Sequence, residues 1–286
     1  MDYFISDRWL STDDLRDDFP LRFMSTSAVV YEVLRTYNSL PFALKRHYQR
    51  LKLSAGLFRM TIPVSYSQLV KLVSEGIDRN RQKIQGREMR IRISLFEEAE
   101  GVSSLILLFQ ELPEVSRDIY ELGVRVGISP HIRPSAAIVN PVIKTPGLPW
   151  NVLTRRCLGE NYDMIMLNEL GNVAEGSFST LFLVKDESLI TPDIKSGVLP
   201  GITRQIVIKL ARSMEIPIEE RNVKSWELFA AEEAFLTHTS AGIVPIRRIL
   251  DHVLIEDFTD GLTRLLLDNL EGFIMSDEEC WVGVDQ

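Results

Sequence analysis

The sequence has few cysteines and no excess of basic residues. Its two cysteines, Cys157 and Cys280, lie far apart and form no CxxC pair. A zinc site or a disulfide framework is therefore not expected, and a reducing cytoplasm is the default compartment. The 40 acidic residues outnumber the 32 lysines and arginines, which gives a net charge of −8. A nucleic-acid partner is not expected, because such proteins use a basic surplus to neutralise phosphates.

Long apolar runs are also missing. No stretch reaches the roughly 18 uncharged apolar residues of a membrane span. Residues 1–14 lack a basic segment followed by an apolar one, so we expect neither a signal peptide nor a membrane partner.

Several common motifs of catalysis are absent. The sequence contains no GxGxxG after a strand, no GxxxxGK[ST], no HExxH and no GxSxG. The usual dinucleotide, P-loop, zinc-protease and serine-hydrolase patterns are thereby excluded. The four histidines are scattered (His47, His131, His238 and His252), and we predict no metal site.

What is present is an ordinary globular composition, with 45% hydrophobic and 25% charged residues in 286 positions, long enough for two domains or one large one. The periodicity predicts strands at 26–36, 88–96 and 103–110 and helices at 43–58 and 66–79 in the first half. Near residue 118 the pattern changes. We expect an α/β (α+β) fold with a smaller α/β domain over 1–118 and a larger strand-rich domain over 119–286.

The predicted elements of the second half form a strand-rich meander with helices outside it. Strands are expected at 122–128, 163–168, 178–185, 188–191 and 232–237. Helices are expected at 151–160, 203–214 and 257–274, with a further one beginning within 226–230.

Two loops of the second half could bind a phosphate. Residues 198–204 (VLPGITR) run into a predicted helix, where free N–H groups and a hydroxyl favour an anion. Residues 237–240 (THTS) end a predicted strand with three hydroxyl groups. Each segment alone reads equally as a helix cap or a polar turn, and that ordinary reading is the commoner one.

Two charged residues stand in apolar surroundings. Glu175 lies within VAEGS, and a glutamate is rarely buried unless it is paired; a protonated pyridine nitrogen would be such a partner. Lys144 follows an apolar run between Pro141 and Pro146. A desolvated lysine is nucleophilic near neutral pH and can form an imine. The alternatives are an exposed strand-end glutamate and a solvated lysine.

Taken together and in this order, the segments resemble the class IV (fold type IV) enzymes that use pyridoxal 5′-phosphate (PLP): branched-chain aminotransferases, D-amino-acid aminotransferases and aminodeoxychorismate lyases. The resemblance runs from about Thr26 to Ile249. Its strongest stretch is 163–204, with 232–246 (EEAFLTHTSAGIVPI) and the early VYEVLRTY and LKRHYQRLKLSA in support.

The resemblance implies a two-domain fold with PLP at the domain interface, and it assigns catalytic roles. Lys144 resembles the lysine that forms the Schiff base and shuttles the substrate proton. Glu175 resembles the acid that pairs with the pyridine nitrogen and keeps the ring an effective electron sink. Tyr31 resembles a tyrosine near the lysine and the substrate carboxylate.

The remaining implied residues hold the cofactor. Arg50 resembles the arginine that forks onto the phosphate, and Leu199 resembles the residue that packs on the ring face. The phosphate loop is matched by backbone and hydroxyl groups in two segments: Ile202 and Thr203, then Thr239 and Ser240.

The substrate pocket departs from the family patterns. Residues 24–27 read MSTS where a YGDG-like turn is usual, and the stretch after Lys144 reads TPGLPW where many branched-chain enzymes have a tyrosine. Arg90 and Arg92 are two apart and share one face of a strand. They are candidates to bind a substrate carboxylate, and a solvated strand face is the alternative.

The resemblance therefore predicts a cytoplasmic, homodimeric PLP-dependent aminotransferase. It would exchange an amino group between an amino acid, branched-chain-like, and a 2-oxo acid by a ping-pong mechanism. Four alternatives stay open. Two share this chemistry: a lyase that releases pyruvate and 4-aminobenzoate from aminodeoxychorismate, and a D-amino-acid aminotransferase. Two lie outside it: a non-catalytic binding module that has kept the fold, and a sugar-phosphate enzyme that uses only the anion loops.

Overall fold

The structure is a computed structural model that describes residues 1–11, 28–97 and 103–283. The expected strand start at residues 26 and 27 and the MSTS segment lie outside these residues. The chain forms two compact units, which we describe separately. The first comprises Met1–Pro113, Val142–Pro146 and Asp277–Gln286, and the second comprises Glu114–Pro141 and Gly147–Ser276.

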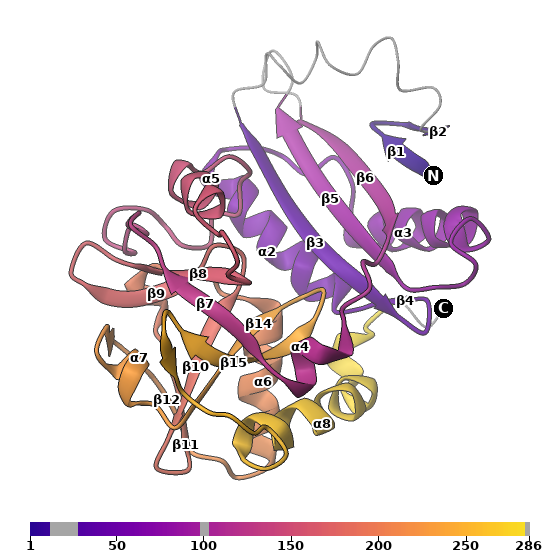
Figure 1. The fold of residues 1–286 in the computed structure, drawn as a ribbon. Helices are drawn as coiled ribbons and strands as arrows, with labels where there is room; N and C mark the ends of the chain where they lie inside the picture. Colours follow the sequence, from indigo (N-terminus) through magenta and orange to yellow (C-terminus); the bar gives the residue numbers. More distant parts are fainter. Residues whose placement is uncertain (12–27, 98–102, 284–286) are drawn as a thin grey trace. The chain divides into compact units, whose positions relative to one another are not determined.

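The first unit is built on a six-stranded sheet in the order β2-β1-β6-β5-β3-β4, in which every pairing is antiparallel. Its long strands and two helices confirm the predicted elements to within a few residues (Figure 1). The elements are β1 (Asp2–Ile5), β2 (Arg8–Ser11), β3 (Val29–Tyr37), β4 (Leu40–Pro41), α2 (Leu44–Leu57), α3 (Tyr66–Arg81), β5 (Met89–Glu97), β6 (Ser103–Glu111) and the short η4 (Glu278–Cys280).

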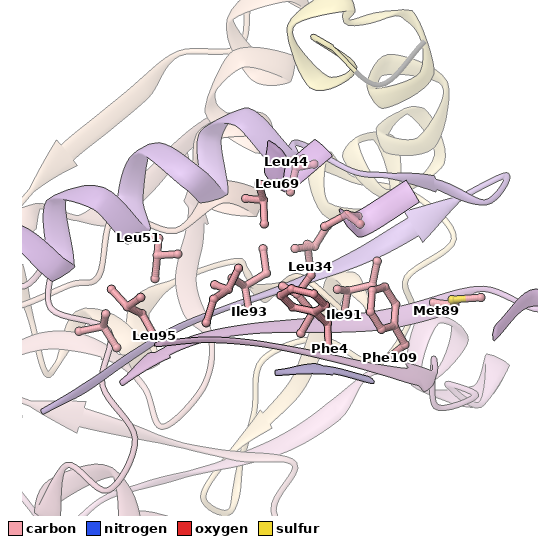
Figure 2. Close-up of a cluster of buried hydrophobic side chains, with 14 of the residues drawn as sticks. Phe4, Leu34, Leu44, Leu51, Leu69, Met89, Ile91, Ile93, Leu95 and Phe109 are labelled. Atoms are coloured by element: carbon pink, nitrogen blue, oxygen red, sulfur yellow. The ribbon is translucent and has the colours of Figure 1, made fainter. Parts of the chain in front are cut away.

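Helices α2 and α3 bury their apolar stripes against one face of this sheet. Leu44 and Leu51 from α2 meet Leu34 of β3 and Ile91 and Ile93 of β5, all of them at most 1% exposed (Figure 2). Alternate residues of a strand point to opposite faces. The sheet therefore has an inner face under the helices and an outer face that presents the other half of its residues.

The second unit contains a larger sheet of mixed strands, ordered β12-β11-β10-β14-β15-β7-β8-β9-β13, with β16 paired to β15. Helices α6 and α8 pack on each other and on β14. The strands are β7 (Val124–Ile128), β8 (Asp163–Leu167), β9 (Asn172–Gly176), β10 (Thr180–Lys185), β11 (Ser188–Pro192), β12 (Ile218–Arg221), β13 (Val223–Lys224), β14 (Glu233–His238), β15 (Gly242–Ile249) and β16 (His252–Val253). The helices are α4 (Arg117–Glu121), α5 (Pro149–Arg156), η3 (Ile194–Ser196), α6 (Ile202–Ser213), α7 (Glu227–Ala230) and α8 (Leu262–Ser276).

The division of the chain differs from a single boundary near residue 118. The chain leaves the first unit after Pro113, and residues 142–146 and 277–283 return to it. Backbone hydrogen bonds explain both returns: Tyr31 N–H donates to the Lys144 carbonyl at 2.9 Å, and Ala43 N–H donates to the Cys280 carbonyl at 3.0 Å. Such long-range pairing leaves no local signal in a sequence.

The predicted helix 257–274 begins later than expected, at Leu262. Glu233, on β14, accepts hydrogen bonds from Leu262 N–H at 3.0 Å and Thr263 N–H at 2.8 Å, and so satisfies the first turn. Gly261 precedes that turn at φ 102°, a conformation that ends any helical run from residue 257.

Across the described residues, no helix has the length and apolar character needed to cross a bilayer.

Candidate active site

Lys144 is fastened to the first unit by its main chain. Its carbonyl accepts from Tyr31 N–H at 2.9 Å, and its N–H donates to the Ser54 hydroxyl of α2 at 3.0 Å. The next residue, Thr145, donates its hydroxyl to the Val29 carbonyl at 2.5 Å. The lysine thus lies on a short segment attached to β3 and α2, and the residue is half-buried.

The Tyr31 ring lies close to two cationic groups. The Arg92 guanidinium carbon is 4.0 Å from the centroid of the Tyr31 ring, and Lys144 Nζ is 5.1 Å from the same centroid. Both distances suit cation–π attraction. The structure therefore brings together three of the predicted site residues, Tyr31, Lys144 and Arg92, in one unit.

Arg90 and Arg92 share a strand face, as predicted, but they have different partners. Arg92 donates Nε–H to the Ser94 hydroxyl at 3.1 Å and stacks on Tyr31. Arg90 donates to the Gln110 side chain at 2.7 Å, on the neighbouring strand β6. Of the two arginines, Arg92 is the one that lies beside Tyr31, the residue whose ring Lys144 also approaches.

Arg50 is 7% exposed and is held by an acid that the sequence analysis did not single out. Glu32, on the inner face of β3, accepts Arg50 Nε–H at 2.7 Å and Nη2–H at 2.6 Å. His47 Nδ1 lies 2.8 Å from the same carboxylate. The Nε edge of the guanidinium is thus held by the Glu32 carboxylate.

Burial and the neighbouring charges together set the ionisation of this cluster. Burial alone raises the pKa of Glu32, but the charge and hydrogen bonds of Arg50, with those of His47, outweigh it and bring the pKa from 4.5 to about 2. Burial lowers the pKa of His47, against the opposing effect of Glu32. The cluster is therefore an ionised Glu32–Arg50 pair with a neutral histidine beside it.

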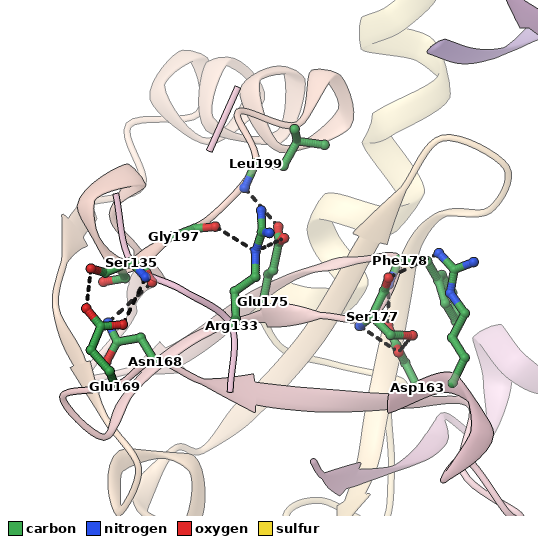
Figure 3. A network of polar contacts seen from close by, with 12 residues as sticks. Arg133, Ser135, Asp163, Asn168, Glu169, Glu175, Ser177, Phe178, Gly197 and Leu199 are labelled. Carbon is green, nitrogen blue, oxygen red and sulfur yellow. Dashed lines mark hydrogen bonds and ion pairs between the residues drawn. The ribbon is translucent and has the colours of Figure 1, made fainter. Parts of the chain in front are cut away.

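Glu175 stands near the end of β9 and is 7% exposed, so the reading of an exposed strand-end glutamate is wrong. Arg133 Nε lies 2.9 Å from Oε1, and Leu199 N–H donates to Oε2 at 2.9 Å (Figure 3). The partner that burial requires is thus supplied within the chain, and Leu199 enters the site by its main chain as well as its side chain.

The turn after Glu175 is fixed by a buried acid. Asp163 accepts from the Ser177 N–H and hydroxyl at 2.9 and 2.7 Å and from the Ser179 hydroxyl at 2.6 Å. A Cβ on Gly176 would lie 2.2 Å from Asp163 Oδ2. Only glycine fits there, which gives a physical reason for the Glu175–Gly176 pair in the sequence.

The two predicted phosphate-binding loops lie at the same end of neighbouring strands. Ile202 and Thr203 open α6, and within the described residues no side chain caps that N-terminus. A Cβ on Gly201 would lie 3.3 Å from Thr180 Oγ1, and Thr180 pairs with Thr237 across β10 and β14. Thr239 and Ser240, both half-buried, form the turn after β14. Uncapped amides beside hydroxyl groups suit an anion.

The predicted residues therefore fall in two groups. The first unit carries Lys144, Tyr31, Arg50, Arg90 and Arg92. The second carries Glu175, Leu199, Ile202, Thr203, Thr239 and Ser240.

The sequence analysis did not single out two charged residues that contact the predicted ones, Glu32 beside Arg50 and Arg133 beside Glu175. Strand parity could have found Glu32, because it falls on the inner face between Val30 and Leu34, where an acid needs a partner. Arg133 lies in a loop and left no comparable signal.

The chain is similar to known proteins over most of its length. A family profile described as amino-transferase class IV matches residues 29–249. A protein from Thermotoga maritima, named "Probable branched-chain-amino-acid aminotransferase", is 44% identical over 95% of this chain and 96% of its own. A crystal structure from Thermotoga maritima, described as a "putative branched-chain amino acid aminotransferase", has a TM-score of 0.87 at 40% identity. The match covers 99% of this chain and 98% of that one. The branched-chain aminotransferase of Thermobaculum terrenum in its PLP form has a TM-score of 0.82 at 26% identity, covering 97% and 95%.

Proposed function

The chain belongs to the class IV aminotransferase family, and on that premise we propose that it moves an amino group between a branched-chain amino acid and a 2-oxo acid, with PLP as cofactor. The substrate class rests on the names of the relatives. The cofactor rests on the family and on the PLP form of a similar structure.

The observation that carries the proposal is the buried carboxylate of Glu175. It is ion-paired to Arg133 and fixed by Leu199 N–H, in the same unit as the uncapped start of α6. Trp150 adds a buried indole N–H that has no hydrogen-bond partner among the described residues. An oriented carboxylate, an anion site and an unpaired donor fit a cofactor with a ring nitrogen, a phosphate and a polar ring substituent.

When bound, PLP withdraws electrons from the substrate Cα and makes its proton acidic. Lys144 would bind the cofactor aldehyde through Nζ. Once a substrate amine has displaced it, Nζ would accept the proton of the substrate Cα and deliver it to C4′ of the cofactor. Tyr31 N–H donates to the Lys144 carbonyl, and this hydrogen bond would help to position the lysine amine. Glu175 would keep a proton on the ring nitrogen.

The remaining assignments concern binding. Arg50, Thr203 and Ser240, with the amides around Ile202 and Thr239, would hold the phosphate, and Leu199 would pack on the ring. Arg92 would meet a substrate carboxylate, because it lies on the same tyrosine as Lys144.

A donor screen tests the proposal. We expect leucine and 2-oxoglutarate to give glutamate, with parallel double-reciprocal lines because the first product leaves before the second substrate binds. Pyruvate formed from aminodeoxychorismate without an acceptor would favour the lyase, and turnover of D-alanine alone would favour the D-amino-acid enzyme. Lys144→Ala should abolish turnover and covalent attachment of PLP, and Lys71→Ala, at an exposed position of α3, should change neither. Full turnover in Lys144→Ala would refute the lysine's role.

The homodimer implied by the resemblance is part of the same proposal. Light scattering should give twice the 32.6 kDa of one chain, and a mass of one chain at micromolar concentration would exclude it.

A further inference from the structure

Arg133 is buried against the acid that the proposed reaction uses. The arginine is 3% exposed and Glu175 is 7% exposed. The 2.9 Å between Arg133 Nε and Glu175 Oε1 is the distance of a charge-assisted contact. Glu175 presents its other oxygen to Leu199 N–H at 2.9 Å. The plane of the carboxylate is thereby set from two sides.

The arginine is itself held by the loop that leads to α6. Arg133 Nε–H donates to the Gly197 carbonyl at 3.0 Å, and Arg133 N–H donates to the Leu167 carbonyl at 2.9 Å. Gly197 adopts φ 101°, and a Cβ there would lie 2.3 Å from the Pro134 carbonyl oxygen. Loop 197–199 and the Arg133–Pro134 segment are therefore in direct contact (Figure 3). The same loop gives a carbonyl to the arginine and an amide to the glutamate.

The chemistry of a shared proton follows from this geometry. A carboxyl group removed from water favours its neutral form unless a cation accompanies it. Next to a pyridine nitrogen, a neutral carboxyl would keep the proton on oxygen. An adjacent guanidinium stabilises the carboxylate and leaves the proton on nitrogen. A guanidinium is planar and more weakly hydrated than an ammonium, which makes arginine well suited to pairing with a buried carboxylate.

We infer that Arg133 is a positioning residue that keeps Glu175 ionised and aligned, and so places the proton of the Glu175–pyridine pair on the ring nitrogen. It also couples that acid to loop 197–199 and hence to the start of α6. The inference rests on the proposed function, because it needs PLP as the ligand. It assigns to the arginine no contact with the substrate or the cofactor.

The test compares PLP with its 1-carba analogue, in which a CH group replaces the ring nitrogen. The variants are Arg133→Gln, Arg133→Lys and the control Arg125→Gln, whose arginine is exposed and paired with exposed Asp251. Tryptophan fluorescence gives Kd for each ligand. We expect Arg133→Gln to weaken PLP about tenfold, corresponding to ~1.4 kcal/mol, and the analogue less than about threefold. Arg133→Lys should recover most of the PLP affinity, and Arg125→Gln should resemble the wild type.

A second measurement reads the proton directly. With PLP labelled by ¹⁵N in the ring, the wild type and Arg133→Lys should give the resonance of a protonated pyridine, and Arg133→Gln should shift toward the unprotonated position. An unchanged resonance together with equal losses for PLP and the analogue would overturn the inference. If Arg133→Gln does not fold, Arg133→Lys decides: a protonated resonance supports the inference, and an unprotonated one contradicts it.

The two proposals fail in distinguishable ways. Wild-type protein that binds neither ligand and shows no modified Lys144 by mass spectrometry would refute the proposed function. Wild-type protein that binds PLP through Lys144, with an Arg133→Gln variant indistinguishable from it, would refute only the role of Arg133.

Discussion

Glu32 and Arg50 form a bidentate ion pair in the interior of the first unit, with Nε–Oε1 and Nη2–Oε2 distances of 2.7 and 2.6 Å. Glu32 lies on the inner face of β3 and Arg50 comes from α2. The arginine proposed to bind a phosphate is thus oriented by an acid on the opposite sheet face from Tyr31, since residues 31 and 32 point to opposite sides of the strand.

Glu32→Gln should destabilise the protein and weaken its binding of PLP. Removing the Glu32 charge breaks a buried ion pair, which costs about 3–5 kcal/mol. Urea unfolding and a PLP titration measure the two effects. Glu75→Gln is the matched control, because the exposed Glu75–Arg79 pair contributes about 0.3–0.5 kcal/mol. Similar losses in the two variants would contradict a buried, ionised Glu32.

The stability of the protein should fall as the pH drops through the range of His238. Burial lowers the pKa of His238 from 6.5 to about 4, while its Nε2 lies 2.7 Å from the Tyr162 hydroxyl. Between these values the unfolded chain binds a proton that the folded chain does not. Above about pH 6.5 both states hold a neutral His238, and its titration takes nothing from the free energy of unfolding. Between about pH 6.5 and 4 the free energy of unfolding decreases progressively, because the unfolded state gains the proton first.

Urea unfolding at a series of pH values tests this prediction. Carboxylates titrate in the same range, so the relevant quantity is the difference between wild type and His238→Asn. That difference should change with pH in the window from about 6.5 to 4. A difference that stays constant would show that His238 does not titrate with a lowered pKa.

Ser54→Ala should reduce turnover by loosening the lysine segment. Ser54 is 1% exposed and accepts the Lys144 N–H, and leaving that amide unpaired costs about 1–3 kcal/mol. We expect kcat to fall several-fold with a smaller change in KM, because the amine is misplaced while the binding groups remain. Exposed Ser67→Ala serves as the control, and equal kcat values in the two variants would argue against the anchor.

Gly197→Ala should destabilise the loop beside Glu175. The residue has φ 101°, and the new Cβ would meet the Pro134 carbonyl oxygen, so the cost should exceed about 1 kcal/mol. Gly272→Ala, on α8 with nothing within 4 Å of its Cβ, should instead stabilise by up to about 1 kcal/mol. Thermal unfolding should therefore shift Tm in opposite directions for the two variants.

Arg92→Gln should raise KM for a dicarboxylic 2-oxo acid more than Arg90→Gln does. Arg92 lies over Tyr31, next to Lys144, whereas Arg90 is engaged with Gln110. Losing a charged hydrogen bond to a carboxylate corresponds to about 1.5–3 kcal/mol. Steady-state kinetics with 2-oxoglutarate provide the measurement, and equal effects of the two substitutions would leave Arg92 without its assigned role.

Sequence periodicity predicted the local elements well, since helices such as α2 and α3 carry their apolar stripe in consecutive turns. It did not predict β9 and β15 as strands. The residues of β9 are all buried, so the alternation that marks a half-exposed strand is absent. The start of α8 was placed too early because its cap, Glu233, comes from a distant strand.

Site residues that lie in recognisable sequence motifs were predicted. The residues that support them, which only folding brings near, were not. Lys144, Glu175 and the two phosphate loops follow from segments with a recognisable order. Their supports do not: Arg133, 42 positions before Glu175 in the chain, reaches it only through the folded loop. The partner of a buried charge is often distant in the sequence, so a single sequence indicates that a partner must exist but not which residue it is.

The return of residues 277–283 to the first unit also constrains biosynthesis. Ala43, just before α2, bonds to the Cys280 carbonyl, and Arg46 bonds to Glu279 at 2.6 Å. On the ribosome these contacts must wait until Cys280 has been made, after every residue of the second unit. The first unit therefore cannot complete its packing before the second unit has been synthesised, unlike domains that fold in N-to-C order.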